Sequence, residues 1–267
     1  MRLFLFYKYI LQNFPSVMTS QLMASFHLQG LGLGVLSGAY FWTYLIVPLL
    51  VGIILDHCGT RWITSSAIFC CSIGIFIFSE AEQLNIAIWG RALIGVGVSF
   101  ATVSYLKLAS IWFSNKYYAL LTSIMISAGM VGAIFGQMPL AWLIHYEGWR
   151  ASLSDLGWIG VLLAILFMLF VRDYPSAISI SPVESKINKM PDSHRIWHNI
   201  LLIVKNKQNW LLTGYSGLAF APVVIFCGLW GNPFLQKAYN LDKLTSPTLI
   251  SLVFVGLGVA SPLFAIF

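Results

Sequence analysis

A charged turn, Gly52-Ile-Ile-Leu-Asp56-His-Cys-Gly59-Thr-Arg61-Trp62, lies at the junction of two long apolar runs, residues 32–55 and 63–79. Each run is close to the roughly 20 residues that a helix needs to cross the hydrocarbon core of a bilayer. In the turn an acid, a glycine and a base follow in fixed order, and glycine permits the left-handed backbone of a tight turn. The pattern therefore predicts a hairpin of two membrane helices, a feature that is ordinary by itself.

The amino-acid composition indicates a membrane protein. The chain is 58% hydrophobic and only 9% charged, whereas a soluble domain carries about a quarter charged residues. Together with the repeated apolar runs, this predicts an all-α integral membrane protein in contact with the lipid bilayer. The net charge of +6 is compatible with nucleic-acid binding, but most bases lie in loops between apolar runs. Membrane topology explains them better, and no nucleic-acid partner is expected.

Eight spans are expected, six before and two after a polar, basic stretch. They cover residues 3–23, 32–55, 63–79, 86–113, 117–146, 152–171, 211–235 and 247–267. In the basic stretch, residues 176–191 are typical of a flexible linker, and 196–210 have the spacing of an amphipathic helix at the membrane surface. With the N-terminus in the cytoplasm, most lysines and arginines outside the spans fall on the cytoplasmic side, as the positive-inside rule requires.

The first span carries four polar residues at helical spacing, Lys8, Gln12, Ser16 and Thr19, which therefore share one helix face. Polar groups are costly in hydrocarbon, so this face is expected to meet protein or a wet cavity. Two alternatives stay open. Lys8 could snorkel to the cytoplasmic surface, and Ser16 and Thr19 could bond back to their own helix.

The fourth span carries an arginine, Arg91, about 7 Å into the helix. Arg91, Gly95, Ser99 and Thr102 share a face. An arginine inside a span indicates a functional site, unless its guanidinium snorkels to the near interface. Lys107 lies off this face, and we expect it to snorkel.

Three other spans show signs of close packing or of irregular helix. Pro48 predicts a kink in the second span. Ala128, Gly132 and Gly136 form a ridge of small residues in the fifth span, which allows close helix packing. Gly231-Asn232-Pro233 predicts a break near the outer end of the seventh span, which in a transporter would line a cavity. The alternative is a simple end of that span.

No cofactor, metal or enzymatic activity is expected. The cysteines lie in or beside apolar spans without the spacing of a metal site, and His194 and His198 have such a spacing but lie in the basic stretch. An enzyme would need a nucleophile and a base, or metal ligands, facing each other at membrane depth. The cysteines are Cys58, Cys70, Cys71 and Cys227.

The charged turn resembles the signature loop between the second and third helices of the major facilitator superfamily, Gly-x-x-x-Asp-(Arg/Lys)-x-Gly-x-(Arg/Lys)-(Arg/Lys). Four residues match it: Gly52, Asp56, Gly59 and Arg61. His57 and Trp62 stand where that pattern prefers bases. In the superfamily the loop is a cytoplasmic gate, so the resemblance implies that Asp56 and Arg61 hold the two halves of the protein in one of two conformations.

Two further motifs are similar to those of the superfamily, and one departs. Arg91-x-x-x-Gly95-x-Gly97 resembles the motif of the fourth helix, and Gly148-Trp149-Arg150 resembles a tripeptide before the sixth helix. The antiporter motif of the fifth helix requires adjacent Gly and Pro, but the proline there is Pro139, which argues against a multidrug antiporter. The overall pattern is loosely similar to bacterial relatives of the lysosomal dipeptide-carrier branch.

The resemblance implies a fold and its domains. These are an N-terminal six-helix half (1–171), a cytoplasmic basic linker (172–210) and the first two helices of a second half (211–267). Because the superfamily has twelve helices, we expect a chain truncated in its second half. We expect a protein that crosses a cell membrane several times. Because the sequence shows no signal peptide, we expect this membrane to be a bacterial inner membrane.

The resemblance also implies a function, transport of a small polar solute by alternating access, with or without a coupling ion. The solute would be an organic anion, a zwitterion or a short peptide. The alternative is a non-transporting remnant, or a subunit that needs a second chain for the missing helices. The superfamily lines its cavity with the first and fourth helices of each half, and the candidate binding residues are Lys8, Gln12, Arg91, Ser99, Tyr215, Trp230 and Asn232.

Overall fold

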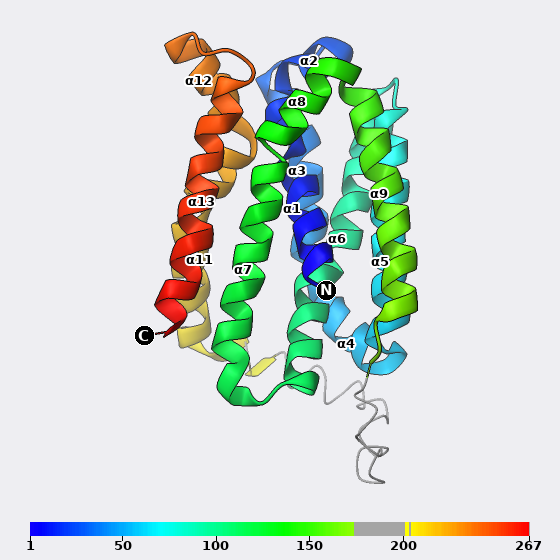
Figure 1. The fold of residues 1–267 in the computed structure, drawn as a ribbon, viewed down its shortest axis with the longest axis vertical. Helices are drawn as coiled ribbons and strands as arrows, with labels where there is room; N and C mark the ends of the chain where they lie inside the picture. Colours follow the sequence, from blue (N-terminus) through cyan, green and yellow to red (C-terminus); the bar gives the residue numbers. More distant parts are fainter. Residues whose placement is uncertain (174–200, 203, 267) are drawn as a thin grey trace.

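Figure 1 shows the computed structural model, which describes residues 1–173, 201–202 and 204–266. Within these residues the chain forms helices and loops and no β-strand, which confirms the all-α prediction. The expected flexible linker lies outside the described residues, as do His194, His198 and residues 196–200 and 203 of the expected surface helix; residues 207–210 of that expected helix belong to α11 instead. The division into 1–171, 172–210 and 211–267 stays a prediction.

The helices follow one another in an up-and-down bundle (Figure 1). The six-span body, as we call the part before the linker, consists of α1 (Arg2–Val17), α2 (Thr19–Ser25), α3 (Gly30–Ile46), α4 (Pro48–Cys58), α5 (Thr60–Ser79), α6 (Leu84–Trp112), the 3-10 turn η1 (Asn115–Tyr117), α7 (Tyr118–Phe135), α8 (Met138–Glu147) and α9 (Trp149–Phe170). The seventh span comprises α11 (Lys207–Ile225), the π-helical turn η3 (Phe226–Trp230) and α12 (Gly231–Tyr239), and the eighth is α13 (Thr245–Ile266).

Broken helices make the number of single-helix spans smaller than expected. Among the described residues, six helices are long and apolar enough to cross a membrane, or up to seven if α2 and α3, bent by 109°, count as one span. The first expected span is divided at Met18, and the second at Val47, directly before Pro48. Proline cannot donate a backbone hydrogen bond and favours the first turn of a helix, which explains the second division.

Small residues bring the helices of the six-span body into close contact. A side chain on Gly90 would lie 2.8 Å from the carbonyl oxygen of Gly74, so α5 and α6 meet backbone to backbone. A side chain on Gly132 would lie 2.1 Å from the carbonyl oxygen of Phe6, and one on Gly136 would lie 3.1 Å from Ile10. The predicted ridge of the fifth span therefore packs against α1, as small residues in membrane helices commonly do.

The charged turn is fixed to the end of α9. Gly59 has φ 76°, as its role in a tight turn requires. The backbone N–H groups of Thr60 and Arg61 both donate to the Asp173 carboxylate at 2.8 Å, which places an acid at the N-terminus of α5. Arg61 Nε donates to the carbonyl of Met168 at 2.6 Å. We refer to this end of the molecule, where α9 ends and α11 begins, as the linker end.

Two further basic residues tie the body together. Lys107 was expected to snorkel, but its Nζ donates to the carbonyl of Leu55 at 2.5 Å. That carbonyl lies in the last turn of α4, where the exposed carbonyl groups of a helix attract a cation. At the opposite end, Arg150 donates from both terminal nitrogens to the carbonyls of Ser79 and Ala81 at 3.0 Å. The Gly148-Trp149-Arg150 tripeptide thus joins the start of α9 to the end of α5.

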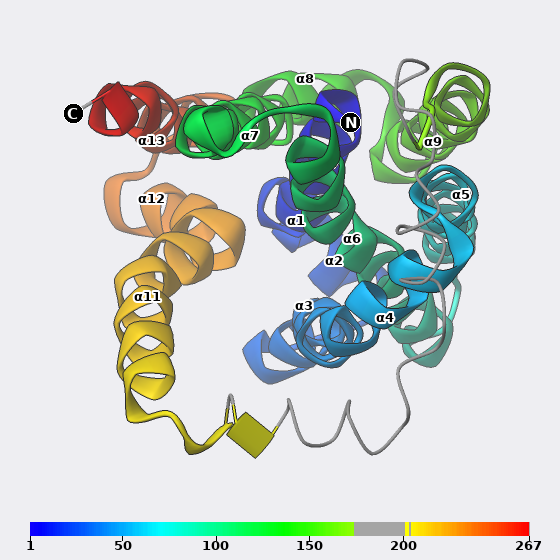
Figure 2. The same ribbon diagram turned by 90° about the horizontal axis from the view of Figure 1, so that it is seen from below.

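The seventh and eighth spans pack unevenly on this body. α13 lies along α7 (Figure 1), whereas α11 has no buried residue. In the view from the linker end, α11 stands apart from α3 and α4 (Figure 2). The expected break at Gly231-Asn232-Pro233 is wrong, since the helix continues to Tyr239 and is interrupted earlier, by the π-helical turn.

Candidate substrate cavity

A cavity of about 1040 Å³ separates the six-span body from the seventh span. One wall comes from α1, α3 and α6, and the other comes from α11 and η3. Trp230 of η3 lines the cavity as well. The polar lining residues of the cavity are Lys8, Tyr9, Gln12, Ser37, Tyr44, Arg91, Thr213 and Ser216. Apolar residues with a few convergent polar groups are typical of small-molecule sites.

Lys8 points into the protein and does not snorkel. Its side chain is only 4% exposed, and Nζ donates to the hydroxyl of Tyr44 at 2.8 Å and to Oγ1 of Thr102 at 3.1 Å. The ammonium also lies 4.7 Å from the centre of the Tyr44 ring and 5.0 Å from that of Tyr9. A lysine has three N–H donors, so one remains beyond these two hydrogen bonds.

Arg91 is buried as well, with 1% exposure. Its two terminal nitrogens donate to the carbonyls of Leu11 at 2.5 Å and of Gln12 at 3.0 Å, which joins α6 to α1. The guanidinium lies between the rings of Phe14 and Tyr40, at 4.5 and 4.6 Å from their centres. These contacts exclude the alternative in which Arg91 snorkels to the near interface.

Positive charge therefore accumulates at the cavity. The hydrogen-bond partners shown for Lys8 and Arg91 are hydroxyls and carbonyls, all of them neutral. None of the described residues that line the cavity carries a carboxylate. Asp155, a carboxylate near the start of the sixth span, is exposed on α9 and does not line the cavity. In a low-dielectric interior, two unbalanced cations favour an anion between them.

Several buried polar atoms near this charge lack a hydrogen-bond partner within the described part of the chain. They are Nε of Arg91, Oγ of Ser37 and the hydroxyl of Tyr40. Unsatisfied polar groups are rare in protein interiors because each costs about 1–3 kcal/mol. Arg91 and Ser37 also line the cavity, but these two atoms are covered in this conformation, so a solute or water molecule reaches them only after the surrounding side chains move.

Four of the seven candidate binding residues line the cavity, namely Lys8, Gln12, Arg91 and Trp230. Ser99 is buried and donates to the Gly95 carbonyl of its own helix. Tyr215 is 75% exposed, on a face of α11 turned away from Thr213 and Ser216. Asn232 is fully buried among other polar side chains and does not line the cavity.

The sequence reasoning missed the contribution of α3. Gly34, Ser37, Gly38, Phe41 and Tyr44 line the cavity. They recur at the three- and four-residue spacing of one helix face, so their periodicity could have identified them. This face of α3 was missed because only the first and fourth helices of each half were expected to line the cavity.

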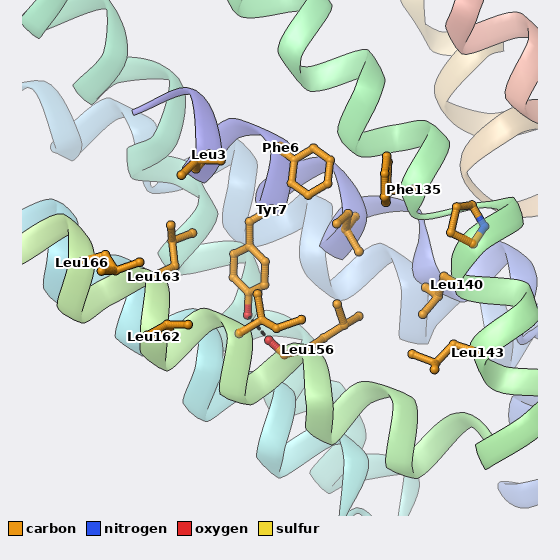
Figure 3. A pocket seen from close by; sticks show the side chains of 13 residues that line it. Leu3, Phe6, Tyr7, Phe135, Leu140, Leu143, Leu156, Leu162, Leu163 and Leu166 are labelled. Atoms are coloured by element: carbon orange, nitrogen blue, oxygen red, sulfur yellow. Dashed lines mark hydrogen bonds between the residues drawn. The ribbon is translucent and has the colours of Figure 1, made fainter.

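A second hollow lies on the other side of α1 and is apolar (Figure 3). This groove has a volume of about 450 Å³ between α1, α7, α8 and α9, and leucines dominate its wall. Its one hydroxyl, on Tyr7, donates to the Leu156 carbonyl at 2.9 Å and is thus already satisfied (Figure 3). No charged side chain lines the groove, so the cavity with Lys8 and Arg91 is the better site for a polar solute.

The chain matches known proteins over most of its length. The family model described as Major Facilitator Superfamily matches residues 3–267. Uncharacterized transporter YybO of Bacillus subtilis is 25% identical over 86% of this chain and 54% of its own length. The probable L-galactonate transporter of Escherichia coli is 22% identical over 84% of this chain and 50% of its own length. This chain spans about half the length of these curated relatives.

The structural comparison agrees. A crystal structure of a bacterial homolog of the human lysosomal transporter Spinster, in an inward-facing and unoccupied conformation, matches with a TM-score of 0.73. The match covers 95% of this chain and 58% of that protein at 16% identity, so it shows the fold alone. Because the family model covers nearly the whole sequence, the chain belongs to the Major Facilitator Superfamily.

Proposed function

We propose that this chain carries the binding cavity of a transporter for a small organic anion, moved by alternating access. The observation that supports this most strongly is the pair of buried cations, Lys8 and Arg91, in a cavity whose described lining contains no carboxylate. Superfamily membership supports a multi-pass protein of the lipid bilayer that acts as a transporter rather than as an enzyme.

The charge distribution favours a carboxylate on the solute. Lys8 has an N–H left after its bonds to Tyr44 and Thr102, and Nε of Arg91 has no hydrogen-bond partner among the described residues. Hydrogen bonds from cationic donors to a carboxylate are about twice as strong as neutral ones. Because both cations are already held by the protein, little side-chain entropy is lost when an anion binds.

The remaining polar groups favour hydroxyls on the same solute. Gln12, Ser37 and Tyr44 lie on the body side of the cavity, and Thr213 and Ser216 lie on α11. These side chains offer neutral donors and acceptors on both walls. A sugar acid has a carboxylate and several hydroxyls, and one of the relatives is named as a probable L-galactonate transporter. We therefore propose a hydroxylated carboxylate as the solute.

The test is binding and uptake of labelled galactonate. Lys8→Met keeps the length of the side chain and removes the charge, so we expect at least tenfold weaker binding to the purified protein and lower uptake into cells at equal membrane abundance. Tyr215→Phe is the matched control, since Tyr215 lies outside the cavity, and it should bind as the parent does. Equal binding by the parent and Lys8→Met would remove Lys8 from the site.

We also propose that further helices cover α11 and α13, supplied by a longer form of this protein or by a second chain. The apolar seventh span has hydropathy suited to a membrane, yet only 6% of its most apolar window is buried. Detection of the native product in membranes of its own cells distinguishes the two sources. A band well above 29.7 kDa indicates a longer chain, and a band at that mass that migrates with a partner in native gels indicates a second one. A lone 29.7 kDa species would contradict both.

The orientation and the gate are proposals as well. The distribution of lysine and arginine supports an N-terminus in the cytoplasm, and the bacterial relatives support a bacterial membrane. The charged turn would then lie at the cytoplasmic face. Arg61 contacts α9 within the body, and a side chain on Gly52 would meet open space. We propose that this open face of α4 receives the covering helices when the transporter changes conformation.

A further inference from the structure

Three interrupted helices meet at the end of the cavity farthest from the linker end. α1 ends at Val17, one residue after Ser16. α7 and α8 are separated at Gly136 and Gln137. The seventh span is π-helical from Phe226 to Trp230. In Figure 1, α2, α8 and α12, which follow the three interruptions, lie together at the end opposite α4. Interrupted membrane helices expose backbone groups that need partners.

Four buried hydrogen bonds connect these interruptions. Gln137 Nε2 donates to Oγ of Ser16 and to the carbonyl oxygen of Cys227, both at 2.9 Å. Asn232 Nδ2 donates to Oε1 of Gln137 at 2.8 Å and to Oγ of Ser16 at 3.3 Å. Ser16, Gln137 and Asn232 are each at most 1% exposed, so water does not compete for these bonds.

The π-helical turn explains why the Cys227 carbonyl accepts a side-chain bond. The backbone N–H of Gly231 donates to Phe226, five residues back, rather than to Cys227. The Gln137 side chain takes this place. An interruption in the seventh span and one in the fifth thus complete each other's hydrogen bonding.

The cluster is the polar attachment of the seventh span to the body. Cys227, Gly228, Gly231 and Asn232 are buried, whereas α11, toward the linker end, has no buried residue. The seventh span therefore touches the body at one end and separates from it along the cavity. Access to the cavity from the linker end needs no change at this cluster, but access from the other end does.

From this arrangement we propose that Ser16, Gln137 and Asn232 form a latch that closes the cavity at the end remote from the linker. Opening at that end requires these hydrogen bonds to break. The purpose of the latch rests on the proposed transport function. Its geometry does not, because the hydrogen bonds form without a solute. One acceptor, Oδ1 of Asn232, is buried without a partner within the described residues. The closed latch thus carries an unsatisfied group, which lowers the cost of release.

A native thiol reports on the latch directly. Cys227 is buried beside it, and Cys71 is buried inside the six-span body. With Cys58 and Cys70 replaced by serine, the labelling rates of the two remaining thiols by N-ethylmaleimide compare the latch with the body in one sample. No solute is needed, so the result is independent of whether the transport proposal holds.

Two variants break the latch and one serves as control. Gln137→Met removes three of the four hydrogen bonds at similar volume, and Asn232→Ala removes two. Interhelical hydrogen bonds in membranes are modest, about threefold in equilibrium each, so we expect Cys227 labelling to rise about 25-fold in Gln137→Met and about tenfold in Asn232→Ala. Ser152→Ala removes a buried hydroxyl whose bond stays within α9 and should change neither rate.

Two results would overturn the latch. Unchanged Cys227 labelling in both Gln137→Met and Asn232→Ala would show that these bonds do not hold the seventh span. A parallel rise of Cys71 labelling would show that the variants loosen the body as a whole, so that the cluster serves global stability and not a local closure. A rise confined to Cys227 supports the proposal.

Discussion

The six-span body and the seventh span are equally apolar but differ in packing. In α5 and α6, 56% and 50% of the most apolar window is buried, against 6% in the seventh span. Small residues let the helices of the body pack closely. Arginines such as Arg91 and Arg150 link these helices by donating hydrogen bonds to backbone carbonyls. The seventh span satisfies its polar groups at one end. The body therefore makes most of its own contacts, whereas the seventh span contacts it mainly at one end.

This difference can be tested first with paired glycines. Gly90→Ala would place a Cβ 2.8 Å from the Gly74 carbonyl oxygen and 2.9 Å from the Phe78 nitrogen, and the overpacking should cost about 3 kcal/mol. Gly214→Ala on α11 meets nothing within 4 Å and should be neutral or slightly stabilising, because alanine is the better helix former. Unfolding in mixed micelles measures both. Equal effects of the two substitutions would contradict the comparison.

A smaller contrast concerns two cations at the same end of the molecule. Arg150→Ala breaks the bonds to the Ser79 and Ala81 carbonyls, and we expect a loss of about 2 kcal/mol of unfolding free energy. Lys237 in α12 is exposed, so Lys237→Ala should stay within about 0.5 kcal/mol of the parent. The same unfolding assay measures both substitutions. A larger loss for Lys237→Ala than for Arg150→Ala would show that a charged residue of the seventh span stabilises the fold.

The smallest effect is expected at the start of the eighth span. Hydrogen bonds from Thr245, first from its side chain and then from its backbone N–H, lower the pKa of Asp242 below its ordinary value of 3.8. A lowered folded pKa means that this stabilisation is present above pH 3.8 and is lost as the pH falls through the folded value. Amide exchange in the first turn of α13 should therefore quicken below about pH 4. Asp242→Asn should abolish that dependence, and a persistent dependence would implicate another group.

The sequence predicted the helices and the charged residues better than it predicted their partners. Helix boundaries follow from apolar run lengths, and Lys8 and Arg91 stand out because charge inside a span is costly. The predicted snorkelling of Lys107 was wrong because its ammonium donates a hydrogen bond to a carbonyl of α4, which is distant in sequence. Ser99 and Tyr215 do not line the cavity as expected, because periodicity gives a helix face but not the neighbour that this face meets.

Interruptions of helices were the hardest feature to place. Proline marks the division at Pro48, and Gly136, with Pro139 three residues later, marks the one between α7 and α8. The π-helical turn has no such signal, since it depends on the Gln137 side chain of another span to bond the Cys227 carbonyl. Local sequence does not reveal tertiary partners of this kind. The latch could therefore not be predicted, and Asn232 was assigned to the cavity instead.

The central claim is that the cavity selects a solute by its negative charge. It is tested most directly by equilibrium binding of galactonate and of its uncharged reduced form, galactitol, to the same purified protein. The two buried cations predict that galactonate binds at least tenfold more tightly and that added salt or a competing carboxylate weakens it. Equal affinity for the charged and the uncharged compound would contradict the role assigned to Lys8 and Arg91.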